Sequence, residues 1–131
     1  MKLIDVFNTR EPLKRLTEKR FNNYKVLRLL VKLRKAVESE VEFCVGEEKK
    51  AVDIYALKDE KGNPVFTTDG RLQLKDVESR IAFEEEIKKL NSTEVDGIKP
   101  VLLREGDFCS PADYPTPSDM VILETVIEFG E

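Results

Sequence analysis

Residues 22–59, with the sequence NNYKVLRLLVKLRKAVESEVEFCVGEEKKAVDIYALKD, decide the fold of this chain of 131 residues. The stretch contains no proline and one glycine, Gly46, and it is rich in leucine, glutamate, lysine and arginine, which favour helices. It predicts one long helix of roughly 55 Å. A globule of this chain length is only about 35 to 40 Å across. We therefore expect the helix to bend, to fold back at Gly46, or to pack against another copy of the chain.

Apolar residues recur along this stretch at alternating intervals of three and four, which is the spacing of a coiled-coil seam. Two charged residues, Arg34 and Glu48, interrupt the seam. We assign six positions to a self-association surface: Leu27, Leu30, Val37, Val41, Cys44 and Tyr55. The sequence thus favours a homo-oligomer held together by the long helix.

Shorter elements are expected on both sides of the long helix. Thr9 has a side chain suited to a helix N-cap, and it precedes a helix that we expect to end near Arg20. Residues 59–64 contain glycine and proline and are expected to stop the long helix. The β-prone runs on both sides of Asp69 and Gly70 then predict a hairpin. We find no internal repeat.

The remaining residues predict a helix, a strand and a final helix. Asp76 is expected to cap a helix that ends near Leu90. Residues 93–103 favour a strand at the edge of a sheet, because they contain glycine and proline. Ser118 is expected to cap a short terminal helix that reaches Ile127.

These elements predict an α+β fold that is mostly helical, in which the long helix is paired with shorter helices and a small β-hairpin or antiparallel sheet is added. The length is that of a single domain over residues 1–131. We expect its helical part at about 9–58, and the hairpin, the next helix and the carboxyl-terminal segment at about 63–131.

Charge is distributed unevenly along the chain. Residues 1–35 have a balance of +8 and residues 36–131 a balance of −12. We favour the interpretation that the basic segment packs against acidic protein, either within the chain or in another subunit. An alternative is a nucleic-acid contact, although aromatic partners for stacking are sparse. The residues for that contact are Lys14, Arg15, Lys25, Arg28 and Lys32. A third interpretation, imitation of a nucleic acid by the acidic remainder, rests on the charge balance alone.

Patterns for catalysis or ligand binding are missing from the sequence. The chain has no histidine, which removes the commonest general base and metal ligand. Its two cysteines, Cys44 and Cys109, lie far apart and match neither a disulfide scaffold nor a zinc site. The six glycines stand singly, without a phosphate-binding pattern. We therefore expect no enzyme activity, no cofactor and no metal.

Four segments resemble a family of short, uncharacterised tailed-phage and prophage proteins of Gram-positive hosts. They are Tyr24–Leu33, Asp59–Asn63, Phe83–Val95 and Ser118–Phe129. The resemblance implies a non-enzymatic structural or accessory protein that binds itself or another phage or host protein. We expect it in the cytoplasm of the host cell or in the virion. Because no apolar run approaches the length of a membrane span, we expect no membrane association.

Overall fold

The computed structural model describes residues 1–130, which form an α+β fold that is mostly helical, so the predicted class is confirmed. The contacts divide the chain into two compact units. Unit 1 combines Met1–Glu42 with the segment from Glu94 onward, and unit 2 comprises Phe43–Thr93. Unit 1 is thus built from both halves of the chain.

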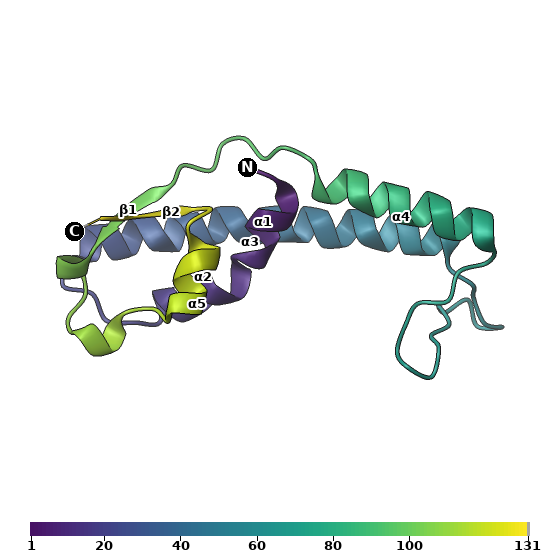
Figure 1. Ribbon diagram of the computed structural model, residues 1–131, viewed down its shortest axis with the longest axis horizontal. Coiled ribbons are helices and arrows are strands. Elements are labelled where there is room, and N and C mark those ends of the chain that lie inside the picture. Colours follow the sequence, from purple (N-terminus) through teal and green to yellow (C-terminus); the bar gives the residue numbers. More distant parts are fainter. Residues whose placement is uncertain (131) are drawn as a thin grey trace. The chain divides into compact units, whose positions relative to one another are not determined.

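The predicted long helix is present as α3 (Tyr24–Tyr55), a helix of 32 residues (Figure 1). It runs through Gly46 without interruption, so the chain does not fold back there. At its amino end, the side-chain oxygen of Asn23 accepts hydrogen bonds from the backbone N–H groups of Lys25 and Val26, at 3.1 and 3.4 Å. This asparagine thereby satisfies two of the N–H groups that have no partner inside the helix.

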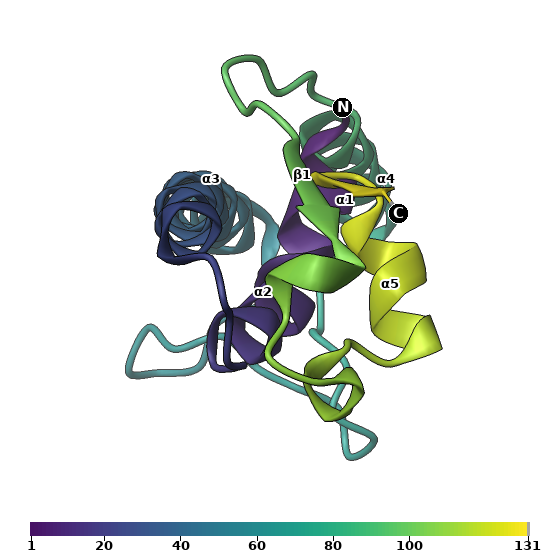
Figure 2. The ribbon, with the colours of Figure 1, turned by 90° about the vertical axis from the view of Figure 1, so that its left-hand side faces the viewer.

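Unit 1 packs short elements against the amino-terminal part of α3. They are α1 (Leu3–Asn8), α2 (Arg10–Thr17), β1 (Val101–Arg104), η1 (Glu105–Asp107), η2 (Pro111–Asp113), α5 (Pro117–Leu123) and β2 (Ile127–Gly130). In the view along α3, the short helices and both strands lie to one side of it (Figure 2). The fully buried side chains include Leu3, Val6, Leu13, Leu16, Leu30, Leu103 and Leu123. Leucines from both ends of the sequence therefore share one core.

Thr9 does not cap α2 with its side chain. It is buried, and its hydroxyl donates a hydrogen bond of 2.6 Å to the carbonyl oxygen of Val6 in α1. The backbone at Thr9 is already helical, so α1 and α2 follow each other directly. The threonine thus satisfies a carbonyl at the end of α1 rather than N–H groups at the start of α2.

The end of the chain differs from the prediction. Ile127 was expected in the terminal helix, but it begins β2, which pairs in parallel with β1 from Val101 opposite Ile127 onward. The cap of α5 is Thr116, whose Oγ1 accepts a 3.2 Å hydrogen bond from the backbone N–H of Asp119, and not Ser118. Pro117 explains this shift, because proline suits the first position of a helix and the cap is the residue before it.

Unit 2 contains the carboxyl-terminal part of α3 and the antiparallel helix α4 (Val77–Asn91), which runs alongside it (Figure 1). The predicted cap of α4 is confirmed: Asp76 accepts a 2.7 Å hydrogen bond from the backbone N–H of Ser79. This contact lowers the pKa of the Asp76 carboxyl. The ring of Tyr55 meets that of Phe83 edge-on at 6.5 Å between centroids, which joins α3 to α4.

Residues 56–75 connect α3 to α4 as three short extended segments, which we call the β ring. The predicted hairpin is present as the antiparallel bridge between Phe66 and Leu72. The other two bridges join Lys58 to Pro64 and Ala56 to Leu74, so each segment pairs with both others. Hydrogen bonds of 2.9 Å link Leu57 N to Gln73 O, Gln73 N to Val65 O, and Val65 N to Leu57 O. This cycle closes the three segments on themselves.

The β ring repeats every eight residues, although no repeat was recognised in the sequence. Its two turns have the same backbone hydrogen bond of 3.0 Å, from Gly62 to Asp59 and from Gly70 to Thr67. Both glycines have a positive φ, of 80° and 83°. Glycine adopts this conformation without a steric cost, as in a type I turn followed by a bulge. Glycine is the only residue type that recurs at equivalent positions of the two turns. One side-chain role also recurs, because Asp59 and Thr67 each accept a hydrogen bond from the backbone N–H four residues further along, at 3.0 and 3.1 Å.

Candidate functional site

The predicted self-association seam packs within the chain. Leu30, Val37, Val41 and Cys44 are buried in the single chain. The remaining two, Leu27 and Tyr55, are half-buried. The predicted seam is therefore apolar and largely buried, as its period requires, but it is not a free surface for a second copy. A stripe that faces the chain's own core has the same spacing as one that faces a partner helix.

The apolar side chains that remain exposed in unit 2 belong to other positions. On α4, Val77 and Ile81 are 72% and 54% exposed and lie one helical turn apart. On α3, Phe43 and Ile54 are also exposed, as is Phe66 in the β ring. No side chain of α4 is buried. Unit 2 therefore exposes apolar side chains on α4, a helix that contributes no fully buried residue to the core.

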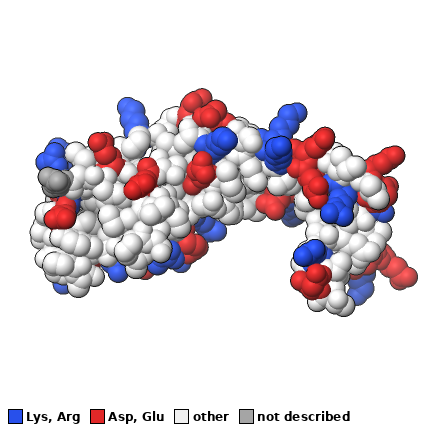
Figure 3. Space-filling view, viewed as in Figure 1, with Lys and Arg blue, Asp and Glu red and all other residues white. Residues whose placement is uncertain are grey.

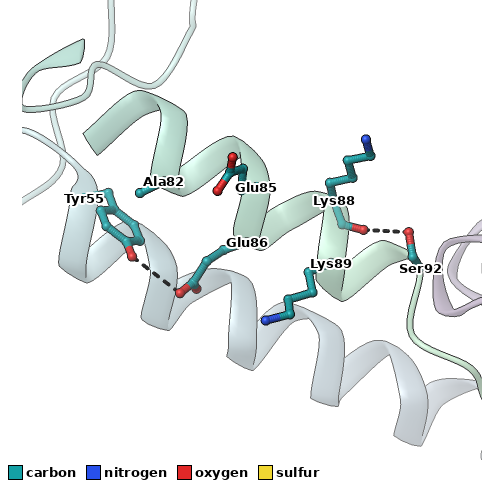
Figure 4. A pocket seen from close by; sticks show the side chains of 7 residues that line it. All are labelled: Tyr55, Ala82, Glu85, Glu86, Lys88, Lys89 and Ser92. Carbon is teal, nitrogen blue, oxygen red and sulfur yellow. Dashed lines mark hydrogen bonds between the residues drawn. The ribbon is translucent and has the colours of Figure 1, made fainter. Parts of the chain in front are cut away.

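A shallow groove of about 530 Å³ lies between α3 and α4, and Figure 4 shows the side chains that line it. The Tyr55 hydroxyl donates a 3.4 Å hydrogen bond to Glu86, and the Ser92 hydroxyl donates one of 2.8 Å to the carbonyl oxygen of Lys88. Partial burial, and then the carboxylate of Glu86, raise the pKa of Tyr55. Tyr55 is thus kept protonated as a donor. The lining side chains of this groove do not include a paired nucleophile and base.

In unit 1, Arg15, one of the residues predicted for a nucleic-acid contact, binds another side chain of the same chain. Arg15 on α2 makes two hydrogen bonds to Asp119 on α5, from Nη2 to Oδ1 at 2.7 Å and from Nε to Oδ2 at 2.9 Å. The hydrogen bond from Arg15 lowers the pKa of Asp119, although burial opposes the shift. The amino group of Met1 likewise pairs with Glu94 at 3.0 Å. These two contacts join the basic beginning of the chain to single acidic residues of the remainder, and the favoured packing of the whole basic segment against acidic protein stays a prediction.

The other basic candidates remain exposed. Lys14 lies on α2, whereas Lys25, Arg28 and Lys32 lie on α3, and Lys35 extends their row by one more step of three residues. We call these four α3 residues, from Lys25 to Lys35, the basic stripe. No ion pair among residues 1–130 involves its side chains. Lys35 was not among the residues predicted for a nucleic-acid contact, although its spacing from Lys32 would have indicated it.

Elsewhere, acidic and basic side chains are interspersed on the face shown in Figure 3. Among residues 1–130, no group of three or more potential ligands could hold a metal ion. No helix in this described part is long and apolar enough to cross a membrane. Cys44 is buried and Cys109 is exposed, and neither forms a disulfide. Comparisons with known protein families, with curated proteins and with solved structures found no match.

Proposed function

We propose that this chain is a non-enzymatic protein–protein interaction module that self-associates through the exposed apolar side chains of unit 2. The observation that carries the proposal is α4, a helix of 15 residues without a buried side chain. An isolated helix of this length is marginal in water, and most helices in proteins are stabilised by the packing of an apolar face. A second copy that covers α4 would supply the missing packing.

Val77 and Ile81 mark the face of α4 that a partner would cover. They lie four residues apart on the helix, so both side chains project from the same side. The opposite side carries half-buried residues, including Phe83, whose ring meets that of Tyr55. One side of α4 is thus used within unit 2, and the other is available to a second copy.

A role in a phage or prophage is part of this proposal. It is supported by the resemblance of the long helix, the turn after it, the region of α4 and the carboxyl-terminal segment to the short phage proteins. An accessory protein that assembles with itself or with a phage or host protein needs interaction surfaces rather than a reaction centre. A location in the host cytoplasm or the virion follows from the same resemblance.

Light scattering coupled to size-exclusion chromatography tests the self-association. The wild type is expected to show a mass above that of one chain, which increases with protein concentration. The double variant Val77→Gln/Ile81→Gln is expected to stay monomeric, because it places polar groups in the proposed interface. Val121→Gln is the matched control, since Val121 is also an exposed helical valine (68%), but it lies on α5 in unit 1. A wild type that remains monomeric at the highest soluble concentration would overturn the proposal.

A further inference from the structure

The basic stripe places like charges next to one another on α3, and none of its side chains forms an ion pair among residues 1–130. Lys25 and Arg28, Arg28 and Lys32, and Lys32 and Lys35 are each three or four residues apart, so like charges are neighbours on the helix surface. Each such like-charge pair destabilises the helix. The first turn of α3 itself contains no acidic residue, although the helix dipole favours negative charge there. The nearest acidic group at this end is Asp107, whose Oδ1 accepts a 3.4 Å hydrogen bond from Nδ2 of Asn23. The charges of the stripe therefore repel one another, and Lys25 lies in the turn where the dipole disfavours positive charge.

The chain does pair other basic residues of the same segment. Arg10 contacts Glu38 at 3.1 Å and Arg15 contacts Asp119 at 2.7 Å. Arg34, which lies on α3 between two residues of the stripe, donates a 3.0 Å hydrogen bond to the hydroxyl of Thr17. The basic stripe is the part of this segment that is left exposed in a row. A row of like charges that forms no ion pair among the described residues is suited to an anionic partner.

We propose that the basic stripe binds the phosphodiester backbone of a nucleic acid. From Lys25 to Lys35 the helix rises about 15 Å, so the four cations form a regular row that can follow successive phosphates. Tyr24, at the beginning of this row, is 76% exposed and offers an aromatic ring on which a base can stack. An acidic peptide would neutralise the cations but has no bases to stack on this ring. The stripe and Tyr24 together therefore favour a nucleic acid.

Fluorescence anisotropy with labelled single-stranded DNA, double-stranded DNA and RNA of mixed sequence tests this proposal. Binding is expected at low salt and is expected to weaken steeply as salt is added. Each phosphate contact contributes about −0.7 to the slope of log K against log salt for a single strand and about −0.9 for B-DNA. Four contacts thus predict a slope of about −3 for a single strand and about −3.6 for B-DNA. Arg28→Gln is expected to reduce the magnitude of the slope by about 1, and the three probes distinguish the kind of nucleic acid.

Two variants with the same change in charge separate the stripe from general electrostatics. The variant with glutamine at all four stripe positions is expected to bind at least tenfold more weakly. The control carries the changes Lys49→Gln, Lys50→Gln, Lys58→Gln and Lys61→Gln, all at exposed positions of unit 2. It is expected to retain most of the affinity. Equal losses in both variants would overturn the proposal, because they would show that net charge alone governs binding.

Thermal unfolding distinguishes lost binding from lost structure. Removal of the stripe's charges relieves the like-charge pairs and the conflict with the helix dipole, so the stripe variant is expected to melt at the same or a higher temperature. Weaker binding by a more stable protein supports a functional stripe. The absence of binding to all three probes at low salt, or equal affinity for polyglutamate, would overturn the assignment to nucleic acid.

Discussion

Arg15 and Asp119 are 104 residues apart in the sequence and are joined by two charge-assisted hydrogen bonds. Nε of Arg15 donates to Oδ2 of Asp119, and Nη2 donates to Oδ1. Arginine suits this arrangement, because its planar fork matches both oxygens of a carboxylate. The Asp119 side chain is largely buried, whereas that of Arg15 is half exposed. The contact fixes α2 against α5 within unit 1.

The first prediction concerns acid stability. Because Arg15 lowers the pKa of Asp119 in the folded chain, Asp119 stabilises the fold above its ordinary pKa, and this contribution is lost as the pH falls through the lowered value. At neutral pH, Asp119→Asn is expected to lower the melting temperature by roughly 5 °C. Under strongly acidic conditions, the two proteins are expected to melt at similar temperatures. Asp96→Asn, at an exposed position, serves as the control; a constant difference at every pH would contradict the assignment.

The second prediction compares two adjacent leucines of α3. Leu30 is fully buried, whereas Leu29 is 44% exposed. Leu30→Ala removes buried apolar surface and leaves a cavity, so it is expected to cost about 2–5 kcal/mol of unfolding free energy. Leu29→Ala is expected to change it by less than about 0.5 kcal/mol, as at most surface positions. Urea unfolding followed by circular dichroism measures both values. Similar costs would show that the register of α3 is wrong.

The third prediction uses two glycines with opposite roles. Gly70 has a φ of 83° in the β ring, whereas Gly46 lies inside α3 with open space around it. Gly70→Ala forces an alanine into the left-handed region and is expected to cost about 1–2 kcal/mol. Gly46→Ala is expected to stabilise the protein by up to about 1 kcal/mol, because alanine is the better helix former. Chemical denaturation of the two variants checks these opposite signs.

The fourth prediction concerns the two thiols. Cys44 is buried, and burial, followed by the charge of Glu48, raises its pKa. Cys109 is exposed. A thiol-specific reagent is expected to label Cys109 rapidly and Cys44 only when the protein unfolds, because the thiolate is the reactive form. Labelling of the Cys109→Ser variant isolates Cys44. Fast labelling of that variant without denaturant would show that the position is open to solvent.

The long helix and α4 were predictable because their signals are local. The period of α3 identified the buried positions, and Asp76 marked the beginning of α4. The period could not show which surface covers the apolar seam of α3, since a core and a partner helix impose the same spacing. Leu30 and Val37 were therefore placed on the correct face of the helix but assigned to a second copy instead of the chain's own core.

The parts that could not be predicted depend on contacts between distant residues. Ile127 continues an apolar helical pattern, and only its pairing with Val101 makes it part of a strand. The closure of the β ring depends on the return of residues 71–75 to residues 55–57, which no short motif encodes. The basic residues were identified as a group from the sequence. That Arg15 pairs with Asp119 and so differs from the basic stripe could be recognised only from the position of Asp119 in the fold.

The composition of unit 1 from two separated segments has a consequence for synthesis on the ribosome. Met1–Glu42 emerge first, but β1, α5 and β2, which complete their core, emerge only after the whole of unit 2. At about 5–20 residues per second, the apolar faces of α1 and α2 wait several seconds for their partners. Unit 2 is continuous in sequence and can form during that interval. The core of Met1–Glu42 is thus completed only after unit 2 has been made.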